Sequence, residues 1–562
     1  MKKLALLILL FSMTSFLWAM PPMPGSGLTY DGSIREGEEY PSALFAPALS
    51  SDVGVRQASA KVEVPVSTTG SKKILVILAD YTDLPFNAYD ASSAATHNKT
   101  YYNDLLQNSS NLTMKKYYSA QSRNLLDLSF YVTETYHADY GYAYYGSNNS
   151  ADNDSNAAGL VKELLTKAAL DGDIPSGLDG CTVIVVHAGP GEEAGSGNPP
   201  SEIDSKKCIW SHRDKLSRHG ISPVEVNGTY FDSYLIVPEY YYYQNTFEAT
   251  IGVFCHEFGH VLGLQDAYDT TYATSGVGQW SLMGGGSWGS NGKGGTTPGS
   301  DPTPLMAWER LALGWIAEED ITPASGDDNY CSFSNINDAN KVCTVKLADD
   351  QYLLLEGKAK NMSGSGMCVM EEGLLITQIH KEILSTYWSK NRINNTSYRP
   401  HGAMVVEAVA SNYATNGLGN LWRKDNTNNR FTTTALFRAD TLTSIGPEYH
   451  KQSAGVPFLL VFIFTVIGSG FIIALVGLLY AGRKKLCAGI AVAAAVVCIS
   501  VSCTISAGGG GGGGGDAYDK GPNTNYYASI RGVHTKTERS GITIYNIICN
   551  SDGSGSFYIR KK

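Results

Sequence analysis

Apolar runs and helix-spaced stretches alternate in the first half of the chain. Lys73–Ala79 and Cys181–His187 are almost continuously apolar, which is typical of strands buried on both faces. Leu126–Val132 alternates apolar and polar positions like a half-buried strand. Two stretches, Asp104–Tyr118 and Leu160–Leu170, have the spacing of amphipathic helices. Strands that alternate with helices predict an α/β layer.

The pattern changes in the second half. Ser275–Ser300 is rich in Gly and Ser and is expected to be a loop, and Leu305–Leu313 is expected to be a helix. Beyond it, short strand-like runs predominate: Tyr352–Glu356, Leu374–His380 and Ala403–Val409. We therefore expect an α/β domain followed by a mainly β region.

A metal-binding pattern lies on another predicted helix, Glu248–Leu262. Its apolar residues recur with the spacing of a buried helical stripe. His256 and His260 are one turn apart on a neighbouring face, so both imidazoles can bind one zinc ion from the same side. Glu257 follows the first histidine, where it can act as the general base for a zinc-bound water. The pattern predicts a hydrolytic zinc site.

A third protein ligand is expected shortly after the helix. Gly263 is placed to end the helix in a left-handed conformation and to reverse the chain. Asp266 then falls where a carboxylate ligand is needed, which would leave the fourth position to water. Asp269 and the more distant Glu309 are the alternatives.

The long pattern from His256 to Asp266 resembles the metzincin-like zinc peptidases, in particular the immune inhibitor A family. Further stretches carry the same resemblance over roughly residues 70–435: Thr113–Tyr118, His187–Glu193, Ile209–His212, Trp280–Gly284, Ala307–Trp308, Leu313–Trp315, Gly373–Ile376 and His380. The resemblance implies a zinc metalloendopeptidase that acts on proteins or peptides. It also implies that Met283 is an apolar residue beneath the metal and not a ligand.

Composition restricts the class of protein. The chain has 562 residues, 43% of them apolar, and a formal net charge of −10, so it is neither a disordered polymer nor a typical nucleic-acid binder. Residues 1–19 resemble a secretory signal peptide, with Lys2 and Lys3 before an apolar stretch. An uncleaved anchor helix is the alternative, and either interpretation predicts export.

A membrane hairpin is predicted near the other end. Residues 456–481 carry no charge and are long enough to cross a bilayer, and a basic tetrapeptide, residues 482–485, follows. Residues 486–507 form a second uncharged stretch. This stretch is either a second transmembrane helix or, because Ser500–Cys503 precedes a Gly run, a lipoprotein-like signal.

These patterns predict the domain plan. A pro-region or N-terminal arm, residues 20–69, precedes a catalytic domain, residues 70–320, and a mainly β region, residues 321–450. An extracytoplasmic β tail, residues 516–562, follows the hairpin. Within it, Ser540–Ile547 resembles the segment with which the family usually closes. Either this tail completes the outer β region from across the hairpin, or two pieces have been joined.

Several other residues receive structural interpretations. His187 and His212 are expected to be structural, and Glu192 and Glu193 to lie in a solvated turn and not in a cleft. Two cysteine pairs could form disulfides, Cys331 with Cys343 and Cys181 with Cys208. Cys255 is expected to be a free core thiol. Ser147–Asn156 is either a solvated loop or a structural calcium site.

The function predicted from these patterns is a secreted or membrane-anchored zinc endopeptidase on the extracytoplasmic side of the membrane. The alternatives are a catalytically silent surface adhesin or binding module with the same fold, and an amidase or other hydrolase that uses the same zinc site.

Overall fold

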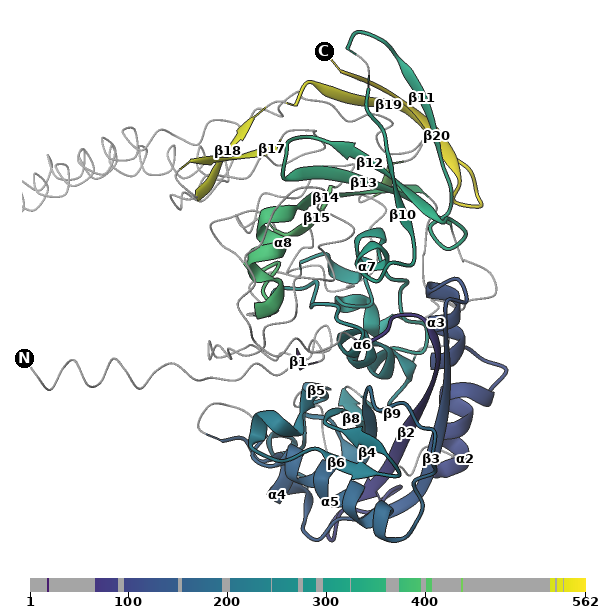
Figure 1. Ribbon diagram of the computed structural model, residues 1–562, viewed down its shortest axis with the longest axis vertical. Coiled ribbons are helices and arrows are strands. Elements are labelled where there is room, and N and C mark those ends of the chain that lie inside the picture. The colour runs from purple at the N-terminus through teal and green to yellow at the C-terminus, as the bar shows by residue number, and fades with distance from the viewer. Residues whose placement is uncertain are drawn as a thin grey trace, which may run out of the picture.

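The computed structural model describes residues 18–19, 66–88, 96–149, 154–194, 203–243, 245–270, 276–289, 297–323, 325–359, 373–395, 401–406, 436–437, 526–530, 533–538 and 540–561. Two parts are distinguished below: an α/β half, residues 18–19 and 66–316, and a β region, residues 317–561. Figure 1 shows the α/β half below and the β region above, with helix α6 (Ile251–Val261) between the large sheets of the two parts.

A seven-stranded sheet is the centre of the α/β half. Its order is β1-β5-β8-β4-β2-β3, with β9 paired to β8. Strands β3, β2, β4 and β8 are parallel, whereas β5 runs antiparallel next to β8. The strands are β1 (Trp18–Ala19), β2 (Gly70–Asp80), β3 (Leu126–His137), β4 (Val183–Pro190), β5 (His212–Lys215), β8 (Ser233–Tyr243) and β9 (Asn245–Glu248). A small hairpin lies outside this sheet, β6 (Val224–Val226) and β7 (Thr229–Phe231).

The apolar runs of the central strands divide between two cores. In β2, Ile74 and Val76 face the core that contains α6, whereas Leu75 and Ile77 face the core that contains α5 (Ala157–Leu170). Alternate residues of a strand point to opposite faces, so a strand covered on both sides must be apolar at every position. This confirms the predicted α/β layer. The other helices of this half are α2 (Lys99–Asn103), α3 (Met114–Gln121), α4 (Tyr142–Gly146) and α7 (Ala307–Ala312).

The β region contains two larger packed sheets. A six-stranded sheet has the order β10-β12-β13-β14-β15, with β16 on β14, and a three-stranded sheet has the order β11-β20-β19. Their strands are β10 (Ala317–Asp320), β11 (Asn329–Phe333), β12 (Lys341–Lys346), β13 (Gln351–Lys358), β14 (Gly373–His380), β15 (Ala403–Val406), β16 (Leu436–Phe437), β19 (Ile542–Cys549) and β20 (Gly555–Lys561). Strands β17 (Tyr526–Ile530) and β18 (Val533–Glu538) form a separate pair, and helix α8 (Lys381–Tyr387) follows β14.

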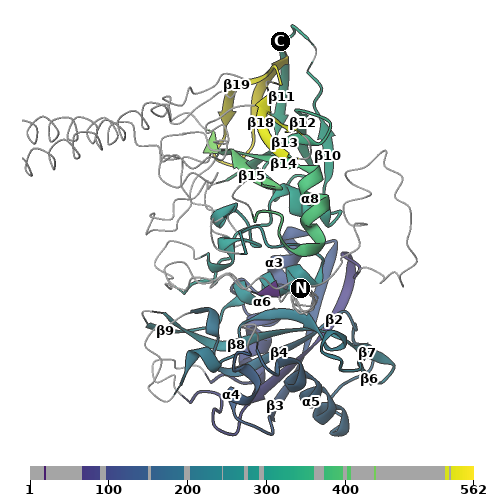
Figure 2. The same ribbon diagram turned by 90° about the vertical axis from the view of Figure 1, so that its left-hand side faces the viewer.

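The central strands of the six-stranded sheet, β13 and β14, are buried on both faces, and the sheet connects the two parts. In β13, Leu353 and Leu355 pack toward the three-stranded sheet, whereas Tyr352 and Leu354 join the core around α6 and α7. One apolar core therefore extends from the α/β half into the β region. The two views in Figures 1 and 2 agree that the three-stranded sheet is the layer farthest from α6.

The C-terminal strands complete the β region. Strand β20 pairs antiparallel with β11, more than two hundred residues earlier in the chain, and β19 pairs with β20. Ile544, Phe557 and Ile559 are fully buried against the six-stranded sheet. Of the two alternatives for residues 540–547, the structure thus supports completion of the outer β region by the tail.

Three local expectations were wrong. The predicted helix Asp104–Tyr118 is interrupted: a π-helical turn, Asp104–Asn108, ends it, and α3 starts separately after the N-cap Thr113. The Gly/Ser-rich Ser275–Ser300 includes two 3-10 helices, Gly278–Trp280 and Gly285–Trp288, whose residues are largely buried. The predicted strand Cys181–His187 is shifted along the chain, since β4 runs from Val183 to Pro190. The helix break is a local effect, because the Thr113 hydroxyl caps α3 by accepting the Lys116 N–H, whereas tertiary packing buries most of residues 276–289.

The membrane and targeting predictions concern residues that the structure mostly does not describe. Residues 456–481 and 486–507, and most of residues 1–69, lie outside the described part of the chain. Within that part, none of the helices combines the length and apolar character needed to cross a bilayer.

Candidate metal centre

Helix α6 carries both histidines and is buried along its whole length. It starts after Thr250, whose hydroxyl donates to the Pro298 carbonyl at 2.7 Å. One side packs on the seven-stranded sheet through residues such as Phe254 and Phe258. His256 and His260 lie one turn apart with ring centroids separated by 4.8 Å. The buried helix thus places the two imidazoles next to each other.

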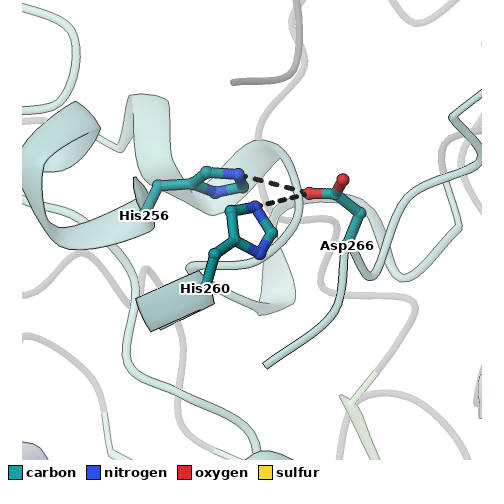
Figure 3. A group of neighbouring side chains, drawn as sticks. All are labelled: His256, His260 and Asp266. Carbon is teal, nitrogen blue, oxygen red and sulfur yellow. Dashed lines mark ion pairs between the residues drawn. The ribbon is translucent and has the colours of Figure 1, made fainter. Parts of the chain in front are cut away.

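Hydrogen bonds orient both rings toward one point. The Nδ1 atom of His256 lies 2.9 Å from the Leu282 carbonyl oxygen, and that of His260 lies 2.9 Å from the Leu264 carbonyl oxygen. A carbonyl only accepts, so Nδ1 carries the proton and Nε2 offers a lone pair. The Oδ1 atom of Asp266 lies 3.2 Å from Nε2 of His256 and 3.3 Å from Nε2 of His260 (Figure 3).

The three side chains fit a divalent metal ion. Their ligand atoms lie within 4.8 Å of one another, and all three residues are buried. Burial lowers the pKa of His260, which favours the neutral imidazole that metals bind. Burial alone would raise the pKa of Asp266, but the two adjacent imidazoles lower it to about 2. Two neutral nitrogens and one carboxylate oxygen are a donor set of catalytic zinc sites.

Asp266 is brought to the histidines, whereas its two competitors are not part of this group. Asp269 follows Asp266 closely in the sequence and is also buried. Glu309 lies on α7, where its carboxylate accepts hydrogen bonds from the Ser281 hydroxyl and from the Met306 backbone N–H. Glu309 therefore supports the loop that passes under the site and does not reach the histidines.

Glycines allow the chain to close around the centre. Gly263 has a φ of 99° and reverses the chain after the helix, as expected from the sequence. A Cβ on Gly259 would lie 2.5 Å from Sδ of Met283, so the absence of a side chain lets Met283 pack between the two histidine turns. The Met283 carbonyl also accepts the Ala267 N–H at 2.7 Å, which connects this loop to the segment of Asp266.

Glu257 is adjacent to the first histidine and fully buried. Burial, with the carboxylates of Glu193 and Glu257, raises the pKa of Tyr241 on β8, and the Tyr241 ring packs on Trp288 with centroids 5.1 Å apart. A buried carboxylate next to a metal centre is a candidate general base.

The prediction that Glu193 lies in a solvated turn was wrong. Glu193 is fully buried, and its carboxylate accepts hydrogen bonds from the hydroxyl and the backbone N–H of Ser211, immediately before β5. Burial raises its pKa. The acidic residue was visible in the sequence, but only the close approach of β5 explains why it is buried.

His187 and His212 lie outside the metal group. His187 faces the core of α5, where its ring packs near Tyr81, and burial lowers its pKa to about 4. The Nδ1 atom of His212 lies 2.7 Å from the Trp210 carbonyl oxygen. Both histidines therefore occupy positions consistent with the structural interpretation.

The described cysteines are all free thiols, so neither candidate disulfide is formed. Cys181 precedes β4, whereas Cys208 lies near the residues that follow the same strand, so the length of the strand separates them. Cys331 and Cys343 lie on strands of different sheets. Cys255 is a buried thiol on α6, as predicted.

Sequence reasoning missed the residues that hold Asp266 from the β region. Asn391, buried after α8, hydrogen-bonds both the backbone and the carboxylate of Asp266. It lies in an Asn-rich stretch without apolar periodicity, which is typical of a loop. Only its position in the fold connects it with the metal centre.

Comparison with known proteins agrees with this geometry. Residues 60–179 and 171–316 match the model of the immune inhibitor A peptidase M6 catalytic domain. The chain is 32% identical over 304 residues to the pre-pro-metalloprotease PrtV of Vibrio cholerae, covering 44% of this chain and 31% of PrtV. It is 30% identical over 279 residues to immune inhibitor A of Bacillus thuringiensis subsp. alesti, covering 41% of this chain and 38% of that protein.

The chain thus spans about a third of the length of these curated relatives. The matched residues include the whole of α6, Asp266 and the Met283 loop. Residues 60–316, which include the candidate metal centre, are therefore similar to the catalytic domain of the immune inhibitor A family of M6 peptidases.

Proposed function

We propose that this chain is a zinc-dependent endopeptidase. The observation that supports it most directly is the convergence of His256, His260 and Asp266 on one buried point, with Glu257 on the same helix. The relatives named above are a metalloprotease and an immune inhibitor A, which agrees with a peptidase role.

The residues divide the chemistry between them. His256, His260 and Asp266 would hold a zinc ion, and the Met283 loop packs against their helix. A zinc ion held there would acidify a bound water molecule and polarise the scissile carbonyl group. Glu257 accepts the proton of the attacking water on its carboxylate and then delivers it to the leaving amine. Burial of Glu257 excludes bulk solvent from this proton transfer.

Two substitutions test the assignment. Glu257→Gln keeps the shape of the general base but cannot accept a proton, so we expect full zinc content and a loss of at least about 100-fold in kcat. His260→Ala removes a ligand, so we expect loss of both zinc and activity. Zinc per chain is measured by atomic emission, and proteolysis with fluorescent casein with and without a chelator.

The outcomes distinguish the alternatives. Full activity of zinc-loaded Glu257→Gln protein would contradict the mechanism. A wild-type chain that binds zinc but leaves casein and peptides intact would favour the catalytically silent adhesin or binding module. Cleavage of small amides but not of peptides would favour an amidase.

We further propose that the enzyme is exported and anchored by the predicted hairpin, with extracellular proteins as substrates. Sequence supports this through the signal-like residues 1–19 and the uncharged residues 456–481 and 486–507. The pairing of β11 with β20 adds an argument. Because strands on both sides of the hairpin belong to one sheet, they lie on the same side of any membrane, and the number of crossings must be even. This favours two spans over one.

The proposed domain plan keeps the catalytic domain at residues 70–320, followed by the β region, and the proposed site consists of His256, His260, Asp266 and Glu257. Protease accessibility of an epitope tag after residue 562, compared with a tag in residues 482–485, tests the topology in intact cells. Protection of both tags would contradict export of the tail.

A further inference from the structure

The β region reaches into the metal centre through one loop. Helix α8 and the 3-10 helix Trp388–Lys390 lead to Asn391, which is buried and has a left-handed backbone with φ of 48°. Asparagine tolerates this conformation better than most residues. The loop thereby presents the Asn391 side chain directly to Asp266, which is 125 positions earlier.

Asn391 makes two hydrogen bonds to the same residue. Its Oδ1 accepts the Asp266 backbone N–H at 2.7 Å, and its Nδ2 donates to Oδ2 of Asp266 at 2.5 Å. The orientation of the carboxamide is unambiguous, because a backbone N–H only donates and must face the oxygen. The NH₂ group therefore faces the carboxylate.

Because of this contact, the two carboxylate oxygens of Asp266 have different partners. Oδ2 is occupied by the Asn391 amide, whereas Oδ1 faces Nε2 of both histidines. A carboxylate that offers one oxygen uses one coordination position of a zinc ion. A carboxylate that offered both would take the position that a catalytic site keeps open for water.

Neighbouring asparagines fix the following residues without touching Asp266. Nδ2 of Asn394 donates to the Ala267 carbonyl at 2.6 Å. Asn395 accepts the Thr270 N–H at 2.9 Å and donates to the Thr270 hydroxyl at 2.6 Å. The segment after Asp266 has no helix or strand of its own through Thr270, so these side chains replace regular secondary structure.

We propose that Asn391 is a positioning residue that makes Asp266 a one-oxygen metal ligand, so that the β region completes the metal centre. The inference rests on the proposed function, because it presumes a metal at this site. It adds a residue that lies outside the matched catalytic domain, which ends at residue 316. A catalytic unit cut at that boundary would lack the support of its third ligand.

The test measures zinc affinity in the full chain by competition with a chelator of known affinity. Asn391→Gly removes the side chain while keeping the left-handed backbone unstrained. Loss of an outer-shell partner typically weakens metal binding 10- to 100-fold, and we expect a loss of about that size. The matched control is Asn395→Ala, which loses two hydrogen bonds in the same loop but no contact with Asp266. Its zinc affinity should stay within about threefold of wild type.

Cobalt substitution adds a readout that a loss of stability does not move. Four-coordinate Co²⁺ absorbs visible light more strongly than five-coordinate Co²⁺, and the geometry of the ligands decides between them. We expect an intense spectrum from the wild type and the Asn395→Ala protein, and a weaker one from Asn391→Gly. Asn391→Ser, whose hydroxyl is too short to make both bonds, should behave like the glycine variant and replaces it if that variant does not fold.

The possible results separate this inference from the proposed function. If the wild type binds no zinc, both are overturned. If the wild type binds zinc and a folded Asn391 variant binds it equally well, the positioning role alone is wrong. Equal losses in the Asn391 and Asn395 variants would also overturn it, because the effect would then come from the loop as a whole.

Discussion

Glu309→Gln is expected to remove a pH dependence of stability from this protein. Glu309 is fully buried on α7, and its two carboxylate oxygens accept from the Ser281 hydroxyl and the Met306 N–H. Burial raises its pKa to about 8, from an ordinary value of 4.5. In the folded protein the carboxyl is therefore protonated at neutral pH, whereas in the unfolded chain it is ionised.

The sign and size of the effect follow from linkage. Between the unfolded and the folded pKa, the native state binds one more proton than the unfolded state, so stability falls as pH rises. Each pKa unit corresponds to about 1.4 kcal/mol, so a rise from about pH 5 to about pH 8 costs about 4 kcal/mol through this group. A neutral glutamine can donate to the Ser281 hydroxyl and accept the Met306 N–H, so it keeps both contacts without titrating.

The assay is urea unfolding, followed by circular dichroism, at several pH values. The difference in free energy of unfolding between Glu309→Gln and wild type should grow in favour of the variant as pH rises. Asp301, whose pKa burial raises to about 7, is present in both proteins and cancels in the difference. Glu309→Ala is the control: it also lacks the titrating group but leaves both donors unpaired, so it should be less stable than Glu309→Gln by about 2–4 kcal/mol at every pH. Parallel pH profiles of the wild type and Glu309→Gln would refute the reasoning.

Two further substitutions test the packing around the site. Gly252→Ala would place a Cβ 2.1 Å from the Ser287 carbonyl oxygen, a backbone atom that cannot rotate away, so we expect a loss of about 2 kcal/mol despite the better helix propensity of alanine; an unchanged melting temperature would contradict this close approach. Phe557→Ala should cost about 3–5 kcal/mol, because Phe557 is fully buried in the core that the tail completes. A loss below about 1 kcal/mol would mean that β20 is dispensable.

The parts of the fold that could be predicted are those whose residue pattern is compatible with a single local structure. Continuous apolar runs at β2 and β4 identified strands covered on both sides. The predicted helix over residues 104–118 failed because its spacing spans two short elements, Asp104–Asn108 and α3, which the non-helical residues 109–113 separate. Most of the described residues 276–289 of the predicted loop are buried because this segment passes under the metal centre, and composition carries no information about that position.

The sequence by itself determined that the two candidate histidine ligands lie together, because two histidines four residues apart on a helix must share a face. It also narrowed the third ligand to three carboxylates, of which Asp266 lies nearest in sequence to the helix. Choosing among them required the tertiary structure, which places Oδ1 of Asp266 next to Nε2 of both histidines and directs Glu309 to Ser281.

The supporting contacts were decided by tertiary structure alone. Asn391 meets Asp266, and β20 meets β11, across separations that no local spacing encodes. Periodicity and capping act over a few residues, and they fix which face of an element is apolar and which side chains lie together on it. The packing of whole sheets decides which distant loop supplies a hydrogen bond. The local patterns of a single sequence do not reveal that packing.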